Sequence, residues 1–324
     1  MINSERIGRA IRTLRKKAGY TQKELADQLF VSPMAVSKWE RGKSIPDPAI
    51  LRKLSTVLDM DVDGLLDGTA TYLDDRWRGA LCLEDSKLPA DSLMFDKPLI
   101  DYLISYFLLA GVREILISCS AREREYIDSR FRGGEALGVR LRFWDSGTLT
   151  AGDMLPREEE ADLMLLSAPF FLYGVDLTRF FQRAMQHRAG AVSPASVVGQ
   201  GGTKIREGYS QYEYQAAPAC FLRSGFLSEC GEDVPLRSLP ALAEREKRLY
   251  MEPMDKGFVL SPLRGAQDVE TVSQLVRIIE ALGRYLIYCP LEIAWRRGMI
   301  GKEQMLREAE RFPEYLEYMD LLRS

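Results

Sequence analysis

Apolar residues near the N-terminus recur at the spacing of amphipathic helices and predict a series of short helices. In the first helix one apolar face opposes Arg and Lys; that face comprises Ile7, Ala10, Ile11 and Leu14. Gly19 ends this helix, and Thr21-Gln22-Lys23-Glu24 forms a capping box that begins the second. An N-cap residue and a first-turn proline begin the third and fourth helices, at Ser32-Pro33 and Asp47-Pro48. Short helices joined by a tight turn predict an all-α helix-turn-helix bundle.

From Gly79 onward the pattern changes, and apolar strand-like runs alternate with amphipathic helices. The strand-like runs cover residues 79–83, 113–119, 139–144 and 162–167. The helical segments cover residues 98–111, 121–131 and 177–187. Strands and helices that alternate at this spacing predict parallel strands with helical crossovers, which form a doubly wound α/β sheet. The later part of the chain alternates less regularly, so we expect the sheet to be mixed.

The change of pattern predicts two domains. A helix-turn-helix domain covers residues 1–68, a polar linker covers residues 69–76, and an α/β body covers residues 77–324. Charge divides the chain in the same way, because residues 1–68 contain 12 Lys and Arg against 9 Asp and Glu, whereas the remainder contains 32 against 38. A basic module on an acidic body predicts a polyanionic partner for the module alone.

Composition disfavours several kinds of site and location. No apolar run reaches the roughly 18 residues of a membrane span, and charged residues occur throughout the N-terminus, so we expect a cytoplasmic protein without a membrane partner. His187 is the single histidine, which leaves little material for a zinc site or a catalytic triad. The cysteines show no close pairs and are interpreted as buried thiols; they are Cys82, Cys119, Cys220, Cys230 and Cys289. We therefore expect no metal and no cofactor.

The stretch from Thr21 to Leu66, which includes SKWERGKSIPD, is similar to the phage-repressor-like (XRE-type) DNA-binding domain. In that family the third helix enters the major groove of double-stranded operator DNA, and the amide end of the second helix lies on a phosphate. The resemblance implies a set of contact residues: Pro33, Met34 and Lys38 facing bases with Ser32 beside them, and Gln22, Arg41 and Lys43 at phosphate-contacting positions. Of the base-facing residues, only Lys38 can donate to guanine, whereas Met34 could pack against a thymine methyl.

The body resembles the sugar-1-phosphate nucleotidyltransferases, above all glucose-1-phosphate thymidylyltransferase. The stretches that carry the resemblance are FDKPLIDYLISYFLLAGVREILISCS, RGGEALGVRLRF, MDKGFVLSP and CPLEIAWRRGMIGKEQM. Together they place nearly all of residues 77–324 within that family's pattern. The resemblance implies a Rossmann-like nucleotidyltransferase fold and a nucleotide sugar as a ligand that the body could still bind.

The chain departs from that family at the positions that bind the nucleotide phosphates and the catalytic metal. The family's glycine-rich loop, which holds the nucleotide phosphates, is missing from this chain. The strand-like run from Gly79 is followed by EDSKLPADSLMF and then by Asp96-Lys97-Pro98, with no glycine-rich stretch between them. The resemblance places Ala168 and Pro262 at the two metal-ligating aspartates. Nucleotidyl transfer needs a metal to neutralise charge between phosphates. The departures therefore predict a body without catalytic activity.

These observations favour a sequence-specific transcription regulator whose pseudo-nucleotidyltransferase body acts as a sensor or an oligomerisation domain. Two alternatives stay open. One is an active sugar-1-phosphate nucleotidyltransferase with relocated residues and an appended DNA-binding module. The other is a scaffold that bridges DNA to a true nucleotidyltransferase.

A homodimer or higher homo-oligomer is also expected, because one module makes few base contacts and two copies can bind half-sites about one helical turn apart. Apolar residues near the C-terminus are the candidate interface; they are Trp295, Met299, Ile300, Leu306 and Tyr315. The alternative is that these side chains fold back onto their own subunit.

Overall fold

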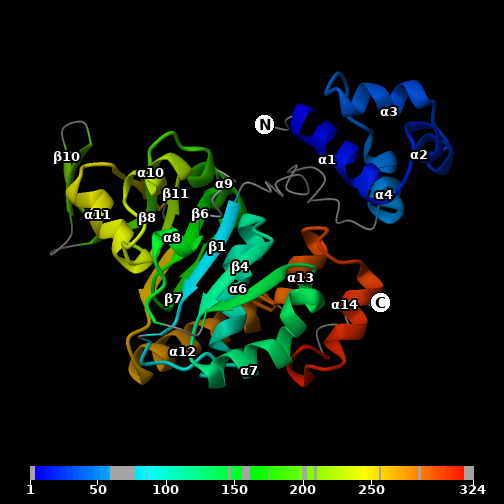
Figure 1. The fold of residues 1–324 in the computed structure, drawn as a ribbon. Coiled ribbons are helices and arrows are strands. Elements are labelled where there is room, and N and C mark those ends of the chain that lie inside the picture. The colour runs from blue at the N-terminus through cyan, green and yellow to red at the C-terminus, as the bar shows by residue number, and fades with distance from the viewer. Residues whose placement is uncertain are drawn as a thin grey trace. The chain divides into compact units, whose positions relative to one another are not determined.

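The computed structural model describes residues 4–58, 77–84, 86–144, 147–154, 161–174, 176–198, 203–207, 210–254, 257–283 and 286–316 (Figure 1). The predicted domain boundary at residue 68 and the linker 69–76 lie outside these residues. By its internal contacts the chain separates into two units. One contains Asp75–Glu135 and Val139–Cys289, and the other contains Met1–Asp74, Ala136–Gly138 and Pro290–Ser324. Each is described by itself below.

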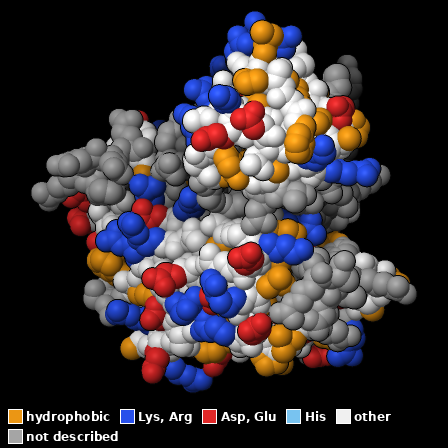
Figure 2. Space-filling view, turned by 90° about the vertical axis from the view of Figure 1, so that its right-hand side faces the viewer, with side chains coloured by type: hydrophobic (Ala, Val, Ile, Leu, Met, Phe, Trp, Pro, Cys, Tyr) orange, Lys and Arg blue, Asp and Glu red, His pale blue; other side chains and the backbone are white. Residues whose placement is uncertain are grey.

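The N-terminal module has the predicted helices, which are α1 (Ser4–Lys17), α2 (Gln22–Leu29), α3 (Pro33–Glu40) and α4 (Pro48–Val57). Both halves of the expected capping box form, since the Glu24 backbone N–H donates to Thr21 Oγ1 at 3.1 Å and the Thr21 N–H donates to Glu24 Oε2 at 2.7 Å. The helices enclose one apolar core; its fully buried members include Ile7, Ile11, Leu25, Leu29, Val36 and Leu54. Exposed positions carry many basic side chains, shown in blue in Figure 2.

The body contains the predicted parallel strands. They are β1 (Trp77–Cys82), β4 (Glu114–Ser118), β5 (Arg140–Trp144) and β6 (Asp162–Leu166), in the order β5-β4-β1-β6. The connecting helices α6 (Leu99–Ala110) and α7 (Ala121–Phe131) match the predicted segments, with the short 3-10 segment η2 (Arg132–Leu137) after α7. The doubly wound prediction is confirmed for this half of the sheet.

The other half of the sheet is mixed, as expected. Next to β6 follow β11 (Ala219–Leu222), β8 (Ala191–Val198), β10 (Ser210–Ala216) and β9 (Thr203–Glu207), each antiparallel to its neighbour in that order. Strand β12 (Leu249–Pro253) pairs with β8 in parallel. Small two-stranded sheets join β2 (Leu93–Met94) to β3 (Lys97–Pro98) and β7 (Phe170–Tyr173) to β13 (Val259–Pro262).

Helices cover both faces of the sheet. On one face, alternate residues of β1, β6 and β11 pack with α10 (Ser224–Glu229), η3 (Leu236–Ser238) and α11 (Leu239–Arg245). On the other face lie α6 and α9 (Leu177–Gln186), since Phe181 contacts Phe221. Helix α6 approaches β1 so closely that a Cβ at Gly79 would lie 2.8 Å from the Phe107 ring. The short helix α8 (Ala151–Met154) and the long helix α12 (Ala266–Gly283) complete this unit.

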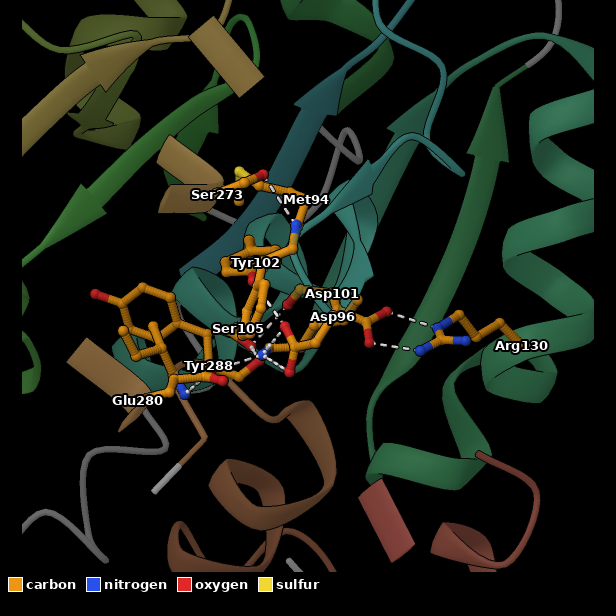
Figure 3. A network of polar contacts seen from close by, with 12 residues as sticks. Met94, Asp96, Asp101, Tyr102, Ser105, Arg130, Ser273, Glu280 and Tyr288 are labelled. Carbon is orange, nitrogen blue, oxygen red and sulfur yellow. Dashed lines mark hydrogen bonds and ion pairs between the residues drawn. The ribbon is translucent and has the colours of Figure 1, made fainter. Parts of the chain in front are cut away.

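A buried polar network joins the segment before α6 to α12 (Figure 3). The fully buried ammonium of Lys97 donates to Asp96 Oδ1 at 2.7 Å and to Glu280 Oε1 at 2.9 Å. The hydroxyl of Tyr102 donates to the Met94 carbonyl at 3.0 Å. Burial raises the pKa of the Glu280 carboxyl, and the attraction of Lys97 opposes that rise. The network therefore satisfies a buried cation with two carboxylates from distant parts of the chain.

The C-terminal helices α13 (Pro290–Arg296) and α14 (Lys302–Ala309) correct one expectation. Of the five residues offered as an apolar interface, Met299, Ile300 and Tyr315 are buried within this chain. The fold-back alternative therefore holds for these three, because a side chain already covered by its own subunit cannot also cover a second one. In the part of the chain that the structure describes, no helix combines the length and the apolar composition of a membrane span.

Candidate nucleic-acid interface

The turn between α2 and α3 sets the relative direction of the two helices. Phe30 ends α2 in the left-handed region, with φ of 57° and ψ of 44°. The backbone N–H of Val31 then donates to the Ala26 carbonyl at 3.0 Å, which closes the turn. Ser32 follows at once as the N-cap of α3, where its hydroxyl accepts from the Ala35 N–H at 3.2 Å. The first exposed turn of α3 is thereby held by hydrogen bonds on both sides of the loop.

We predict that Phe30→Gly stabilises the module by about 0.5–1 kcal/mol. A left-handed conformation costs a non-glycine residue roughly 1–2 kcal/mol, and the exposed contact of Phe30 with the Lys53 ammonium, 5.3 Å from the ring centroid, offsets only part of that cost. Hydrogen exchange in α2 and α3 of the full chain measures the change. Gln28→Gly is the matched control, because the same residue inside a helix should destabilise by about 1 kcal/mol. Equal destabilisation by both variants would contradict the prediction.

A buried ion pair fixes α3 against α1. Arg15 Nε donates to Glu40 Oε1 at 2.6 Å and Arg15 Nη2 donates to Glu40 Oε2 at 3.2 Å, and the two side chains are almost fully buried. Arg15 Nη1 also donates to the Tyr20 carbonyl at 2.6 Å. The helices pass so closely that a Cβ at Gly8 would lie 2.1 Å from the Trp39 carbonyl oxygen. The orientation of α3 is therefore set by a bidentate contact and by tight backbone packing.

Gln22 takes part in the same cluster. Its side-chain nitrogen donates to Glu40 Oε2 at 2.7 Å. An amide nitrogen carries two hydrogens, so one remains for a phosphate oxygen at the amino end of α2. The predicted phosphate contact of Gln22 thus remains a prediction, and the structure adds that Glu40 orients this side chain.

The other predicted contact residues lie on the surface of the module. All of them have exposed side chains; they are Ser32, Pro33, Met34, Lys38, Arg41 and Lys43. Met34 is 64% exposed, an unusual value for a large apolar side chain. Arg41 donates from Nε to the Ser37 carbonyl at 3.1 Å, which holds its guanidinium beside the end of α3. By contrast Val36 and Trp39 are buried in the core of the module. The helix therefore separates a packing face from a face that is free to contact a ligand.

Comparison with known proteins supports the assignment of this module. A family model described as Helix-turn-helix matches residues 11–65. The competence pilus inhibition repressor of Acinetobacter baylyi is 35% identical over 92 residues, which are 28% of this chain and 81% of that protein. The chain belongs to the helix-turn-helix family of regulators. This regulator shares 37–41% identity over 58–67 residues with three further family members, and it spans between 28% and 62% of their lengths.

The body of the regulator is similar to a different kind of protein. Glucose-1-phosphate thymidylyltransferase of Xanthomonas campestris is 22% identical over 245 residues, which are 67% of this chain and 82% of that enzyme. A solved structure from Bacillus anthracis, described as a glucose-1-phosphate thymidylyltransferase in complex with sucrose, is 12% identical with a TM-score of 0.49. It covers 62% of this chain and 95% of that one. The body of the regulator thus resembles nucleotidyltransferases by sequence.

The two positions predicted to have lost metal ligands lie on neighbouring segments of the regulator. Ala168 follows β6, and the next strand, β7, pairs with β13 so that Phe170 lies opposite Pro262. The Leu263 N–H also donates to the Pro169 carbonyl at 3.1 Å. Segments remote in sequence are therefore brought together beside the carboxyl end of β6, where an α/β sheet places its ligands. Neither Ala168 nor Pro262 offers a carboxylate there.

Asp268 is the next acidic residue after Pro262 along the chain. Asp268 accepts the Arg264 N–H at 2.8 Å, next to the start of α12. Within the described ranges of the regulator, His, Cys, Asp and Glu side chains form no group of three or more that could hold a metal ion.

The sequence analysis did not predict that Arg15 and Glu40 form an ion pair with each other. A signal was present, because Arg15 falls four residues after Ile11 and Glu40 falls four residues after Val36, so both extend the buried faces of their helices. Two opposite charges at such core-facing positions indicate a buried pair.

Proposed function

We propose that this protein is a sequence-specific, DNA-binding transcription regulator whose body serves as a sensor or an oligomerisation unit without nucleotidyl transfer. The observation that carries the proposal is the exposed face of α3. The buried Arg15–Glu40 pair fixes the opposite side of α3 against α1, so the exposed face has a fixed orientation in the module. Preorganisation of this kind lowers the entropy lost on binding. Similar proteins point the same way, since they include a transcriptional activator and a competence pilus inhibition repressor.

In the proposed complex, residues at the start and middle of α3 would contact bases, whereas residues at the start of α2 and after α3 would contact phosphates. The amino end of α3, with Ser32, Pro33 and Met34, would enter the major groove, and Lys38 one turn later would reach a base edge. Lys43, Arg41 and the second amide hydrogen of Gln22 would contact phosphates and set the register. Because this base-reading set contains one strong donor, two copies on adjacent half-sites would be needed for a nanomolar operator affinity.

We predict that Lys38→Ala and Lys43→Ala weaken DNA binding in different ways. Lys38→Ala should lose discrimination at one base pair, at a cost of about 1–3 kcal/mol, whereas Lys43→Ala should weaken all sequences alike and reduce the salt slope by about one. Gel shifts on the DNA upstream of the protein's own gene, with single-base variants and a salt series, measure both effects.

Lys16→Ala supplies the control for this experiment, because it removes the same charge from an exposed position on α1 that has no assigned contact. Wild-type affinity in both test variants at moderate salt would refute the docking geometry. A uniform loss in all three variants would show that net charge alone drives binding.

We also predict that the body releases no pyrophosphate from a nucleoside triphosphate and a sugar 1-phosphate in the presence of Mg²⁺. Ala168 and Pro262 lie on neighbouring segments and neither is a carboxylate, and the phosphate-holding loop is missing from the sequence. Loss of these groups should reduce the rate by several orders of magnitude. A pyrophosphate assay with a glucose-1-phosphate thymidylyltransferase as positive control measures the rate.

Restoring one ligand tests the same idea from the other side. Ala168→Asp alone should leave the assay at background, because the phosphate cradle is still absent. Pyrophosphate release by the wild-type protein that disappears on addition of EDTA would instead establish an active enzyme.

A further inference from the structure

The C-terminal segment contains a buried cation without a counter-charge. Arg297 directly follows α13 and is only 4% exposed. Its Nε, Nη1 and Nη2 atoms are all buried, and none has a hydrogen-bond partner in the structure. Burial lowers the pKa of this guanidinium to about 10, so it remains charged at neutral pH. A buried ion of this kind destabilises the fold, because no partner compensates for its lost hydration.

The neighbouring carboxylates are engaged elsewhere. Glu292 accepts from Arg296 Nε at 2.7 Å, and Glu308 accepts from Arg311 Nη1 at 3.1 Å. These are the two buried acidic residues in the described part of the segment from 290 to 316. Trp295, two residues before Arg297, adds a buried indole N–H that has no acceptor. This segment therefore has surplus donors, and the groups that would complete it are acceptors.

We infer that Arg297 is an anion-binding residue, and that its ligand is the phosphate group of a small molecule. A guanidinium presents five N–H donors along two edges, and all of them are unused here. One carboxylate would occupy one edge with two oxygens, whereas phosphate brings more oxygens and up to two negative charges to the same cation. Bound phosphate removes the cost of the unpaired charge, so part of the binding free energy comes from relief of that cost. The site lies outside the DNA-contact set and does not depend on it.

Calorimetric titration of the full chain with inorganic phosphate tests the inference, with chloride as the background anion. Wild-type protein should bind phosphate in a 1:1 ratio and should bind acetate at least tenfold more weakly. Arg297→Lys keeps a cation but loses the planar fork, so the phosphate affinity should fall at least tenfold. Glycerol 3-phosphate serves as a second titrant that distinguishes an organic phosphate ester from the free ion. Tighter binding of the ester would indicate further contacts around the phosphate.

Two control variants separate this site from other cations. Arg307→Met removes an exposed arginine of α14 and should leave phosphate binding unchanged. Arg12→Met removes an exposed arginine of α1 and should also leave phosphate binding unchanged. Absence of phosphate binding by wild-type protein at 10 mM, on the order of the weakest useful affinity, overturns the inference. Equal binding by wild type and Arg297→Lys also overturns it.

A thermal measurement keeps the test decisive if Arg297→Lys folds poorly. Arg297→Met removes the unpaired charge, so its unfolding midpoint in chloride should exceed that of the wild type. Added phosphate should raise the midpoint of the wild type but not that of Arg297→Met, since only the former holds the ligand in its folded state. A lower midpoint for Arg297→Met in chloride, together with an unchanged phosphate response, would assign this arginine a structural role instead.

Discussion

Arg15→Met is expected to lower the free energy of unfolding of the N-terminal module by about 3–5 kcal/mol, because it leaves Glu40 as a buried charge that has lost its cation. Glu40 would keep only the hydrogen bond from Gln22, at 2.7 Å. Methionine also cannot donate to the Tyr20 carbonyl, which Arg15 Nη1 reaches at 2.6 Å. Hydrogen exchange of α1 and α3 in the full chain measures the loss. Operator binding should fall in parallel as α3 loses its fixed orientation.

Arg12→Met is the matched control for this experiment. Arg12 lies on the same helix but is exposed, so its replacement should change stability by no more than about 0.5 kcal/mol. The double variant Arg15→Met with Glu40→Gln removes both charges and should recover part of the loss. If the amide hydrogens of α1 and α3 exchange at the same rate in Arg15→Met and Arg12→Met, the Arg15–Glu40 pair does not stabilise the module and the proposed rigidity of α3 is wrong.

The second large effect is expected in the body, where Lys97→Met should destabilise the junction of α6 and α12 by about 3–5 kcal/mol. The substitution leaves Asp96 and Glu280 facing each other without the ammonium that both now contact (Figure 3). Two carboxylates close together in a buried site repel, so α12 should exchange its amide hydrogens much faster. Exchange measured by mass spectrometry, peptide by peptide, distinguishes this local loss from global unfolding.

Lys87→Met is the control, since Lys87 is exposed in the loop between β1 and β2. A triple variant that combines Lys97→Met with Asp96→Asn and Glu280→Gln should regain much of the protection of α12, because no charge is left unpaired. Full protection of α12 in Lys97→Met alone would show that apolar contacts, rather than the ion pairs, hold this helix.

Local signals made the elements predictable. The capping box at Thr21 and the N-caps Ser32 and Asp47 act within three residues, so the sequence reveals them directly, and the structure confirms each. The parallel strands β1 and β6 are buried on nearly all sides and therefore appear in the sequence as short apolar runs.

Features that depend on distant pairing were not predictable in the same way. The ion pair of Arg15 with Glu40 joins residues 25 positions apart, and that of Lys97 with Glu280 joins residues 183 positions apart. Apolar residues such as Met299 and Tyr315 suit a core and an interface equally well by composition, so only the packing of the chain shows that they are buried. The neighbourhood of Ala168 and Pro262 likewise follows from the pairing of β7 with β13.

The strand order also has a consequence for how the chain folds during synthesis. β6 can pair on its second side only when β11, which begins at Ala219, has left the ribosome. β8 likewise pairs with β12, which covers residues 249–253 and is synthesised later still. The described core of the module, in contrast, lies within residues 7–58. At roughly 5–20 residues per second, the interval from β1 to β11 is on the order of ten seconds, and local helical contacts form far faster than that. A nascent chain that stalls before Ala219 should therefore display a folded helix-turn-helix module on a body whose sheet edge is open to aggregation.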